Sequence, residues 1–462
     1  MAGVSGSERS DAGGRAPASL SRVILTALLP SLVFSIGEGA ILPIVPSVAQ
    51  SLGAGLEFAG FIAGAIMIGQ MLGDLPSGPL VARIGEQRAM LVGSFVAIVG
   101  VVACVLAPNA WVLLVGILVI GFAAATFNLA RHAFLTKYVP LAYRARALST
   151  LGGVFRAGFF VGPFITSAVL GLTGLAQHAF WIFIVCIAIV IVVLLVVPDV
   201  ERETERRAAR EVSGPNGAAG AEAASGAKAD GASSGAASSD GAPSPAPTRP
   251  AGRPPRRRTS VWAVMREHAG ALATLGVGAG VIAALRGVRV VLMPLWALSI
   301  GMSDAETAIV VGVAGGIDFA LFFTSGWVMD RFGRGAAAVP SLCGLGVGFI
   351  ALALTHDVDG AVGWFWLLAM WLGLANGLGS GILMTLGADL APPDEPAPFL
   401  GAWRLIIDAG SASVPFAVAG LTALFSLPLA AAVFGVAGLA GAALLVVQLP
   451  RRLGPGGRPR QG

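Results

Sequence analysis

Charged residues are scarce in this chain of 462 residues, where they make up 12% of the sequence against 56% hydrophobic residues. About a quarter of the residues in soluble globular domains are charged, so this composition excludes a soluble globular domain. Lysine occurs only at positions 137 and 228, as Lys137 and Lys228. Neither lies in the G-x-x-x-x-G-K-[ST] loop that cradles nucleotide phosphates, and the chain therefore carries no P-loop ATPase.

Three further absences narrow the function. The three cysteines, Cys104, Cys186 and Cys343, lie singly within apolar runs, and this spacing fits neither a disulfide framework nor a metal site. The sequence contains no basic patch combined with a nucleic-acid-binding motif, which argues against binding to nucleic acid. No convincing Ser/His or paired-Asp arrangement occurs, so we expect no catalytic residue, no cofactor and no metal.

Long apolar runs dominate what is present, and each is near or above the ~20 residues needed to cross a bilayer. The first six runs are Val23–Val45, Leu56–Leu80, Ala89–Ala107, Trp111–Leu135, Ala147–Leu172 and Phe180–Val197. The second six are Ala269–Leu298, Ala305–Met329, Ala336–Leu354, Val362–Leu386, Pro398–Leu421 and Ala430–Leu449. They predict an all-α membrane protein of twelve helices in two bundles of six.

Composition also predicts the domain boundaries. Residues 1–20 and 451–462 form polar tails, and residues 21–198 and 266–450 hold the two bundles. Residues 199–265 are rich in Ala, Gly, Ser, Pro and Arg and cannot bury enough apolar surface to fold, so we expect a disordered linker. The first run is too long for a signal peptide and has no small-residue cleavage site, which predicts a retained helix.

The placement of basic residues predicts the orientation. The connections that follow odd-numbered runs contain no Lys or Arg, whereas those that follow even-numbered runs carry residues such as Arg83, Arg88, Lys137, Arg331 and Arg334. By the positive-inside rule both termini and the linker are cytoplasmic in an inner (plasma) membrane.

One short phrase occurs twice, as residues 77–85 (SGPLVARIG) and residues 325–333 (SGWVMDRFG). Each copy follows one apolar run and precedes another, which indicates two related bundles and the movement of a solute. The repeat continues in register: Arg156 matches Asp408, and Glu38 matches Arg289. The two halves thus keep the same spacing but carry charges of opposite sign.

The second copy resembles the G-x-L-x-D-R-x-G-R-R/K motif of the major facilitator superfamily. The residues that match are Gly326, Asp330, Arg331, Gly333 and Arg334, and the first copy keeps Gly78 and Arg83 but has Ala82 in place of the acid. The resemblance implies two pseudo-symmetric bundles around a cavity that opens alternately to each side, in a monomer. It also implies that Gly78, Arg83, Asp330 and Arg331 let helices approach and latch one bundle to the other.

A second resemblance lies in the fifth run. Gly158, Gly162 and Pro163 match the G-x-x-x-G-P motif of the superfamily's drug:proton antiporters, although Thr166 and Ser167 replace the Gly-Gly that follows. This resemblance favours export over import. Simple packing of small residues against a neighbouring helix is the alternative explanation.

Charged residues within the apolar runs are the sharpest functional signal, because an idle charge at the centre of a bilayer costs about 2.5–3.5 kcal/mol on insertion scales. The family resemblance places the fifth run against the eighth and the second against the eleventh. We therefore expect interface or gating pairs between Arg156 and Asp318 and between Asp74 and Arg404, with Asp408 facing Gln70.

The first and seventh runs line the cavity in this superfamily, which makes Glu38, Arg286 and Arg289 candidates for binding substrate or carrying a coupling proton. Asp408, Asn128 and Asn376 are further candidates. A fixed ion pair that holds the halves together is the alternative role for the charged set. The aromatic residues Trp296, Phe122, Phe127 and Trp371 are candidates for apolar walls.

These observations favour a secondary transporter whose partners are a small-molecule substrate, a coupling proton and the lipid bilayer. The main hypothesis is proton-coupled export of a small lipophilic compound. A permease for a metabolite such as a sugar or an organic acid is the alternative, and a transport-inactive receptor or sensor is a second one.

Overall fold

The computed structural model describes residues 27–139, 141–196, 265–392 and 396–453. The predicted tail 1–20 and linker residues 199–264 lie outside these ranges. The described part contains 12 helices that are long and apolar enough to cross a membrane, as the sequence predicts. Both sets of six belong to one compact unit of the chain.

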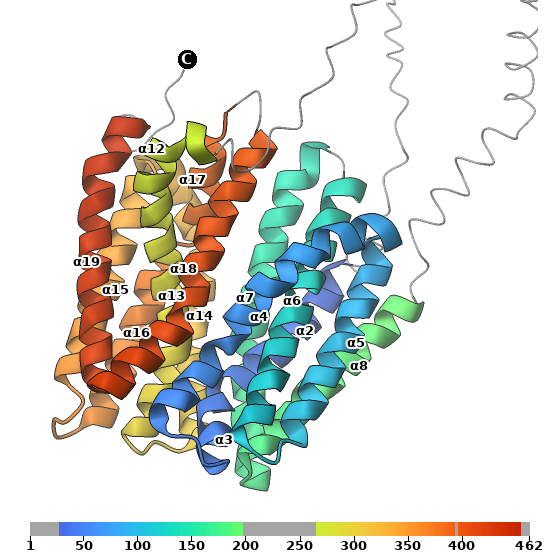
Figure 1. Cartoon of the computed structure of the whole chain (residues 1–462), viewed down its shortest axis with the longest axis vertical. Helices are drawn as coiled ribbons and strands as arrows, with labels where there is room; N and C mark the ends of the chain where they lie inside the picture. Colours follow the sequence, from blue (N-terminus) through green and yellow to red (C-terminus); the bar gives the residue numbers. More distant parts are fainter. Residues whose placement is uncertain (1–26, 140, 197–264, 393–395, 454–462) are drawn as a thin grey trace, which may run out of the picture. The chain divides into compact units, whose positions relative to one another are not determined.

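The first bundle contains six spans, coloured blue to green in Figure 1. They are α2 (Leu29–Ile41) continued by η2 (Leu42–Ile44) and α3 (Val45–Ser51), then α4 (Leu56–Ile84), α5 (Glu86–Val105), α6 (Ala110–Tyr138), α7 (Leu141–Thr173), and η3 (Ala176–His178) leading into α8 (Ala179–Val196).

The second bundle contains six spans, coloured yellow to red in Figure 1. They are α12 (Ala269–Ala271) with the π-helical turn η4 (Leu272–Gly276) and α13 (Val277–Ser299), then α14 (Asp304–Phe332), α15 (Gly335–Leu354), α16 (Ala361–Leu378) continued by α17 (Ile382–Leu390), α18 (Pro396–Leu424) and α19 (Leu427–Arg452).

Local sequence explains where several helices begin and end. The Asn109 side chain accepts hydrogen bonds from two backbone N–H groups of α6, and Ser303 with Glu306 forms a capping box at the start of α14. At the other end of α14, Gly333 has φ +93°, and Gly85 has φ +84° after α4. These positive angles favour glycine and stop both helices at the same point of the repeated phrase.

Two spans are broken, and the apolar runs do not predict either break. The first span passes through the 3-10 turn η2, where Pro43 and Pro46 interrupt the α-helical hydrogen bonding. The tenth is interrupted at residues 379–381, where Gly381 adopts φ +82°. Broken helices inside a membrane are tolerated where protein or a cavity satisfies the freed backbone groups.

The two bundles meet through α7 against α14 and α4 against α18, as the family resemblance implies. Within the first bundle, aromatic rings join α2, α6 and α8: the ring centroids of Phe34 and Phe127 lie 4.4 Å apart in a stacked arrangement, and Phe183 meets Phe34 edge-on at 5.4 Å. This packing holds α2 in place and thereby positions the functional residues that α2 carries.

Candidate functional site

A cavity of about 250 Å³ lies where the two bundles meet, next to both broken spans. Residues from five spans line it. They include Leu42 and Pro43 of η2, Phe155, Arg156 and Phe159 of α7, Arg286, Arg289 and Met293 of α13, Asp318 of α14 and Asn376 of α16. Sequence patterns point to Arg156, Arg286, Arg289, Asp318 and Asn376, but not to the two phenylalanines.

Asp318 is the acid in this cavity, and two arginines face it from different helices. The Oδ2 atom of Asp318 lies 3.9 Å from Arg156 Nε and 3.8 Å from Arg289 Nη2. The predicted Arg156–Asp318 pair therefore forms, and it joins α7 to α14 across the bundle interface. Both separations exceed a hydrogen-bond distance, so the carboxylate is shared loosely between the two guanidinium groups.

The break in the tenth span is tied to the same cluster. A helix break leaves carbonyl groups without their usual partners. Arg286 Nη2 donates to the Gly379 carbonyl, and the Ser325 hydroxyl lies within hydrogen-bond distance of the carbonyls of Leu378 and Ser380. The Ser380 hydroxyl in turn donates to Asp318 at 3.3 Å. The cavity charges thus hold the broken span in place.

Glu38 lies apart from this cluster, buried inside the first bundle with 2% of its surface exposed. Its Oε1 atom accepts a hydrogen bond from Gln70 at 3.3 Å, and its Oε2 atom has no hydrogen-bond partner among the described residues. Arg131, on α6, is the cation that interacts electrostatically with it. Arg131 is itself 4% exposed and stacks over the ring of Phe155, 4.9 Å from its centroid.

Arg131 is a further functional candidate, and it is not among the charged residues predicted from the sequence. The signal is present in the sequence, because Arg131 lies inside the predicted run Trp111–Leu135. Glu38 does not lie with Arg286 and Arg289 as predicted, because the two arginines line the cavity whereas Glu38 is not among the lining residues and contacts Gln70. The described residues also show no ion pair between Glu38 and these arginines, which was the alternative role. The internal repeat accounts for the partner of Glu38. Glu38 corresponds to Arg289 and Gln70 to Asp318, so the Glu38–Gln70 contact in the first half is the counterpart of the Arg289–Asp318 contact in the second.

Arg404 forms a second link between the bundles, nearer the basic end, which we define as the end that carries Arg83, Arg88, Arg331 and Arg334. Arg404 Nη2 lies 3.3 Å from Asp74 Oδ2, so the predicted pair forms and joins α4 to α18. Arg404 Nε also lies 3.4 Å from Asp408 Oδ2, one helical turn away. Asp408 therefore faces Arg404 rather than the predicted Gln70, which is engaged by Glu38.

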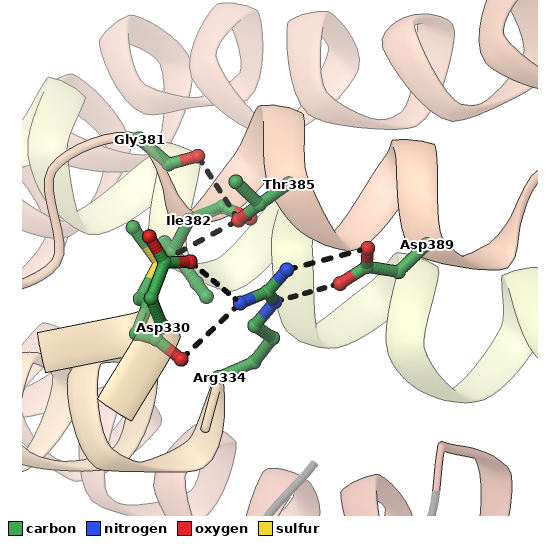
Figure 2. Close-up of polar contacts among 7 residues, drawn as sticks. Asp330, Arg334, Gly381, Ile382, Thr385 and Asp389 are labelled. Carbon is green, nitrogen blue, oxygen red and sulfur yellow. Dashed lines mark hydrogen bonds and ion pairs between the residues drawn. The ribbon is translucent and has the colours of Figure 1, made fainter. Parts of the chain in front are cut away.

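Asp330 of the repeated phrase and Arg334, which follows the phrase directly, make contacts within the second bundle. Figure 2 shows the guanidinium of Arg334 between the carboxylates of Asp389, on α17, and Asp330, on α14. Arg334 Nε lies 2.7 Å from Asp389 Oδ2, and Nη1 lies 3.4 Å from Asp330 Oδ1. The hydrogen bond to Asp389 raises the pKa of Arg334 above its ordinary value and keeps it charged. The expected latch between bundles is thus, for Asp330, a contact within one bundle.

The first half carries the matching contact with its signs reversed. Glu86 follows Gly85 as Arg334 follows Gly333, and Lys137 precedes Pro140 by the same three positions as Asp389 precedes Pro392. Lys137 Nζ lies 3.2 Å from Glu86 Oε2. Both halves therefore use an ion pair at the same place at the basic end.

A family model described as the Major Facilitator Superfamily matches residues 28–415. The chain belongs to the major facilitator superfamily. A solved D-xylose-proton symporter has the same fold, with a TM-score of 0.65 at 13% identity over 93% of this chain and 97% of that chain. This likeness shows the superfamily fold of two six-helix bundles and does not extend to the substrate.

Curated relatives match over shorter stretches. The galactose-proton symporter of Escherichia coli is 21% identical over 180 residues, which cover 39% of each chain. The gallate transporter of Pseudomonas putida is 31% identical over 133 residues, which cover 28% of this chain and 29% of that transporter. The chain therefore spans less than half the length of these superfamily members in each comparison.

The glycines of the superfamily motif have a different role from the one expected. A Cβ atom added at Gly78 or Gly326 would meet no atom within 4 Å, so neither residue marks a close helix approach in this structure. The glycines with a conformational role are Gly85 and Gly333, which end α4 and α14. Arg83 is exposed, and Arg331 stacks near Trp327 and Phe332 at the basic end.

The motif that resembles drug:proton antiporters packs one helix against another. A Cβ atom at Gly158 would collide with Ser35 and Ile36, and one at Gly162 with the backbone of Ile36 and Ala40. The hydroxyl of Thr166, four residues after Gly162, donates to the Ala40 carbonyl at 2.7 Å. The glycines of the motif are therefore explained by close packing of α7 on α2, whatever the direction of transport.

Of the two asparagines and four aromatic residues expected at the cavity, the structure places only one asparagine there. Asn376 lines the cavity with its Oδ1 atom unpartnered among the described residues, whereas Asn128 does not belong to the lining. The proposed aromatic walls lie elsewhere: Phe127 stacks on Phe34, Trp296 is buried against His356, and Trp371 donates to the Gly344 carbonyl. Phe122 is also absent from the cavity lining. Phe155 and Phe159 take the place expected of these residues.

Proposed function

We propose that the chain is a proton-coupled transporter of a small polar metabolite that works by alternating access. The observation that carries this proposal is Glu38, a buried carboxyl group with one oxygen free, held near a buried arginine and one helical turn from the cavity wall at Leu42. Intramembrane ionisable groups without a fixed partner serve as functional sites by default, because their insertion is costly.

Protonation of Glu38 reaches the cavity through Arg131 in this proposal. When Glu38 is ionised, its charge balances that of Arg131. When it is protonated, Arg131 loses its counter-charge and can shift. Because its guanidinium stacks on Phe155, whose ring lines the cavity, this shift moves the cavity wall. The protonation state and the shape of the substrate site are thereby linked, which is what coupling between proton and substrate requires.

The names of the relatives support a metabolite over a lipophilic drug. The relatives described above carry galactose with protons or carry gallate, according to their names. The motif that favours export is accounted for by packing of α7 on α2, so it supports no direction. We therefore propose symport in place of export, and the export of lipophilic compounds remains the competing hypothesis that the experiment addresses.

The orientation and state of assembly belong to the same proposal. The basic end faces the cytoplasm of an inner membrane, with both termini on that side, because translocated short loops carry few Lys and Arg residues. The chain acts as a monomer, since a single chain supplies both bundles and the cavity that they enclose.

Reconstitution into sealed liposomes tests the function. An inward-directed proton gradient should drive accumulation of a transported metabolite from a panel of sugars and organic acids, and a protonophore should abolish it. The Glu38→Gln variant should keep exchange of labelled for unlabelled substrate but lose accumulation, because the amide cannot carry the proton.

Glu57→Gln is the matched control, since Glu57 is exposed at the start of α4 and remote from the cavity lining. It should accumulate substrate like the unmodified protein. Full proton-driven accumulation by Glu38→Gln would remove Glu38 from the coupling mechanism. Proton-dependent extrusion of lipophilic dyes, without uptake of any metabolite, would favour export instead, and a protein that moves nothing would favour the receptor alternative.

A further inference from the structure

We infer that the cavity takes a small organic anion, with the carboxylate of the ligand among Arg156, Arg286 and Arg289 and its apolar body against Phe155 and Phe159. The inference names the substrate class for the transporter proposed above and rests on that function. It is carried by the charges, the free donors and the apolar walls of the cavity.

The charges of the lining do not cancel. Three arginines and one acid, Asp318, line the cavity, so three positive charges and one negative charge leave a formal excess of two positive charges. Arg156, Arg289 and Asp318 sit well inside the protein, with side-chain exposures of 22%, 13% and 12%, and Arg286 is half-buried. Buried charges without partners are costly, which makes this place favourable for an added negative charge.

The arginines also have donors to spare. The Nε atoms of Arg156, Arg286 and Arg289 are buried and lack a hydrogen-bond partner among the described residues. Asp318 does not satisfy them, because its contacts with Arg289 and Arg156 are 3.8 and 3.9 Å long. A carboxylate offers two acceptor oxygens in a plane, which matches the forked donors of a guanidinium group.

Neutral and cationic solutes fit this lining less well. A sugar needs several neutral hydrogen-bonding side chains, and Asn376 is the one neutral polar side chain among the lining residues in the described part of the chain. A cation would face three guanidinium groups. The rest of the wall is apolar, including Leu42, Met293 and the two phenylalanine rings, and suits a flat or branched hydrocarbon body.

The size of the cavity sets a limit on the ligand. Sites for drug-sized molecules occupy about 300–1,000 Å³, whereas this cavity measures about 250 Å³. The anion is therefore compact, on the scale of a single ring or a short branched chain that bears one or two carboxylates.

Binding to the purified full-length protein tests the inference without any transport step. Benzoate and benzamide serve as probes of nearly equal shape that differ in charge, with hexanoate and galactose as further probes, all at constant ionic strength. Benzoate or hexanoate should raise the thermal midpoint in a saturable manner, while benzamide and galactose should not. Equal stabilisation by benzoate and benzamide, or binding of galactose alone, would overturn the inference.

Charge variants test the site with effects of opposite sign. Arg289→Gln and Arg286→Gln should each weaken the affinity for benzoate about tenfold or more, because hydrogen bonds to charged groups are among the strongest in proteins. Asp318→Asn removes the competing carboxylate and should tighten binding severalfold. Arg266→Gln, an exposed arginine outside the lining, should leave the affinity unchanged. If the arginine variants do not fold, the benzoate and benzamide comparison still decides.

The two proposals fail in different ways. Saturable benzoate binding without proton-driven uptake of any solute would leave the anion site standing and reject the proton-coupled transporter. Proton-driven uptake of galactose, with no binding of benzoate or hexanoate, would keep the transporter and reject the anion site.

Discussion

Single glycines decide where the repeated phrase bends. Gly85 and Gly333 adopt φ angles of +84° and +93°, at which an L side chain is strained, while Gly78 and Gly326 have open space around them. Four glycines that look equivalent in the sequence thus fall into two classes, because only the backbone conformation separates a helix end from a helix interior.

A matched pair of alanine substitutions measures this difference. Gly85→Ala should destabilise the protein by about 1–3 kcal/mol, since the φ,ψ region of Gly85 is essentially restricted to glycine. Gly78→Ala should be neutral or stabilising by up to about 1 kcal/mol, because alanine is the better helix former. Thermal or denaturant unfolding in one detergent provides the measurement. A larger loss at Gly78 than at Gly85 would contradict this explanation.

Residue pairs were predictable where the repeat and the family resemblance specify which helices touch. Arg156–Asp318 and Asp74–Arg404 are of this kind. The partner of Glu38 was not predictable in the same way, because the rotation of α2 about its axis decides whether Glu38 faces α13 or turns toward α4 and α6. Packing of Phe34 on Phe127 and Phe183 sets that rotation, and no local pattern encodes it.

At the scale of elements, all twelve spans follow from hydropathy, but the breaks within them do not. A window of about twenty residues averages over Gly379, Ser380 and Gly381, although these residues end α16 and start α17. The two glycines in the sequence do indicate that a helix break is possible at this point. Whether they interrupt the helix depends on tertiary partners, here Arg286 and Ser325, that take up the freed carbonyl groups.

The ion pair of Arg334 with Asp389 should anchor α17 to the start of α15. Asp389→Asn removes a charge from a mostly buried contact and should lower the local opening free energy of α17 by about 1–3 kcal/mol. Hydrogen exchange of the amides in Ile382–Leu390 should accelerate accordingly. Asp330→Asn is the control, because the Asp330 side chain is 82% exposed and exposed pairs contribute about 0–1 kcal/mol. Equal effects of the two variants would refute an anchoring role.

At the scale of the whole molecule, a polar contact between described residues joins the bundles near each end of the cavity. Arg404 meets Asp74 toward the basic end, linking α18 to α4. Toward the opposite end, the Ser47 hydroxyl of α3 donates to Asp304 of α14 at 2.9 Å. Alternating access opens one end while it closes the other, so the two contacts should bias the same equilibrium in opposite directions.

Spin labels on α4 and α18 at the basic end can report that equilibrium. Asp74→Asn should raise the population with a long distance between these labels by up to about fivefold, since a part-exposed ion pair contributes roughly 0.2–1 kcal/mol. Ser47→Ala should reduce that population by a similar factor. Changes of the same sign in both variants would show that the contacts do not act as opposing gates.

The sign reversal between the halves has an evolutionary consequence. Pseudo-symmetry places Asp408 toward α4 as it places Arg156 toward α14, where Arg156 meets Asp318. A chain made from two copies of the second half would therefore bring Asp408 and Asp318 together, acid against acid, at the centre of a membrane. Each half thus supplies one charge of the pair that the other half completes, and a chain of two identical halves would lose the Arg156–Asp318 contact.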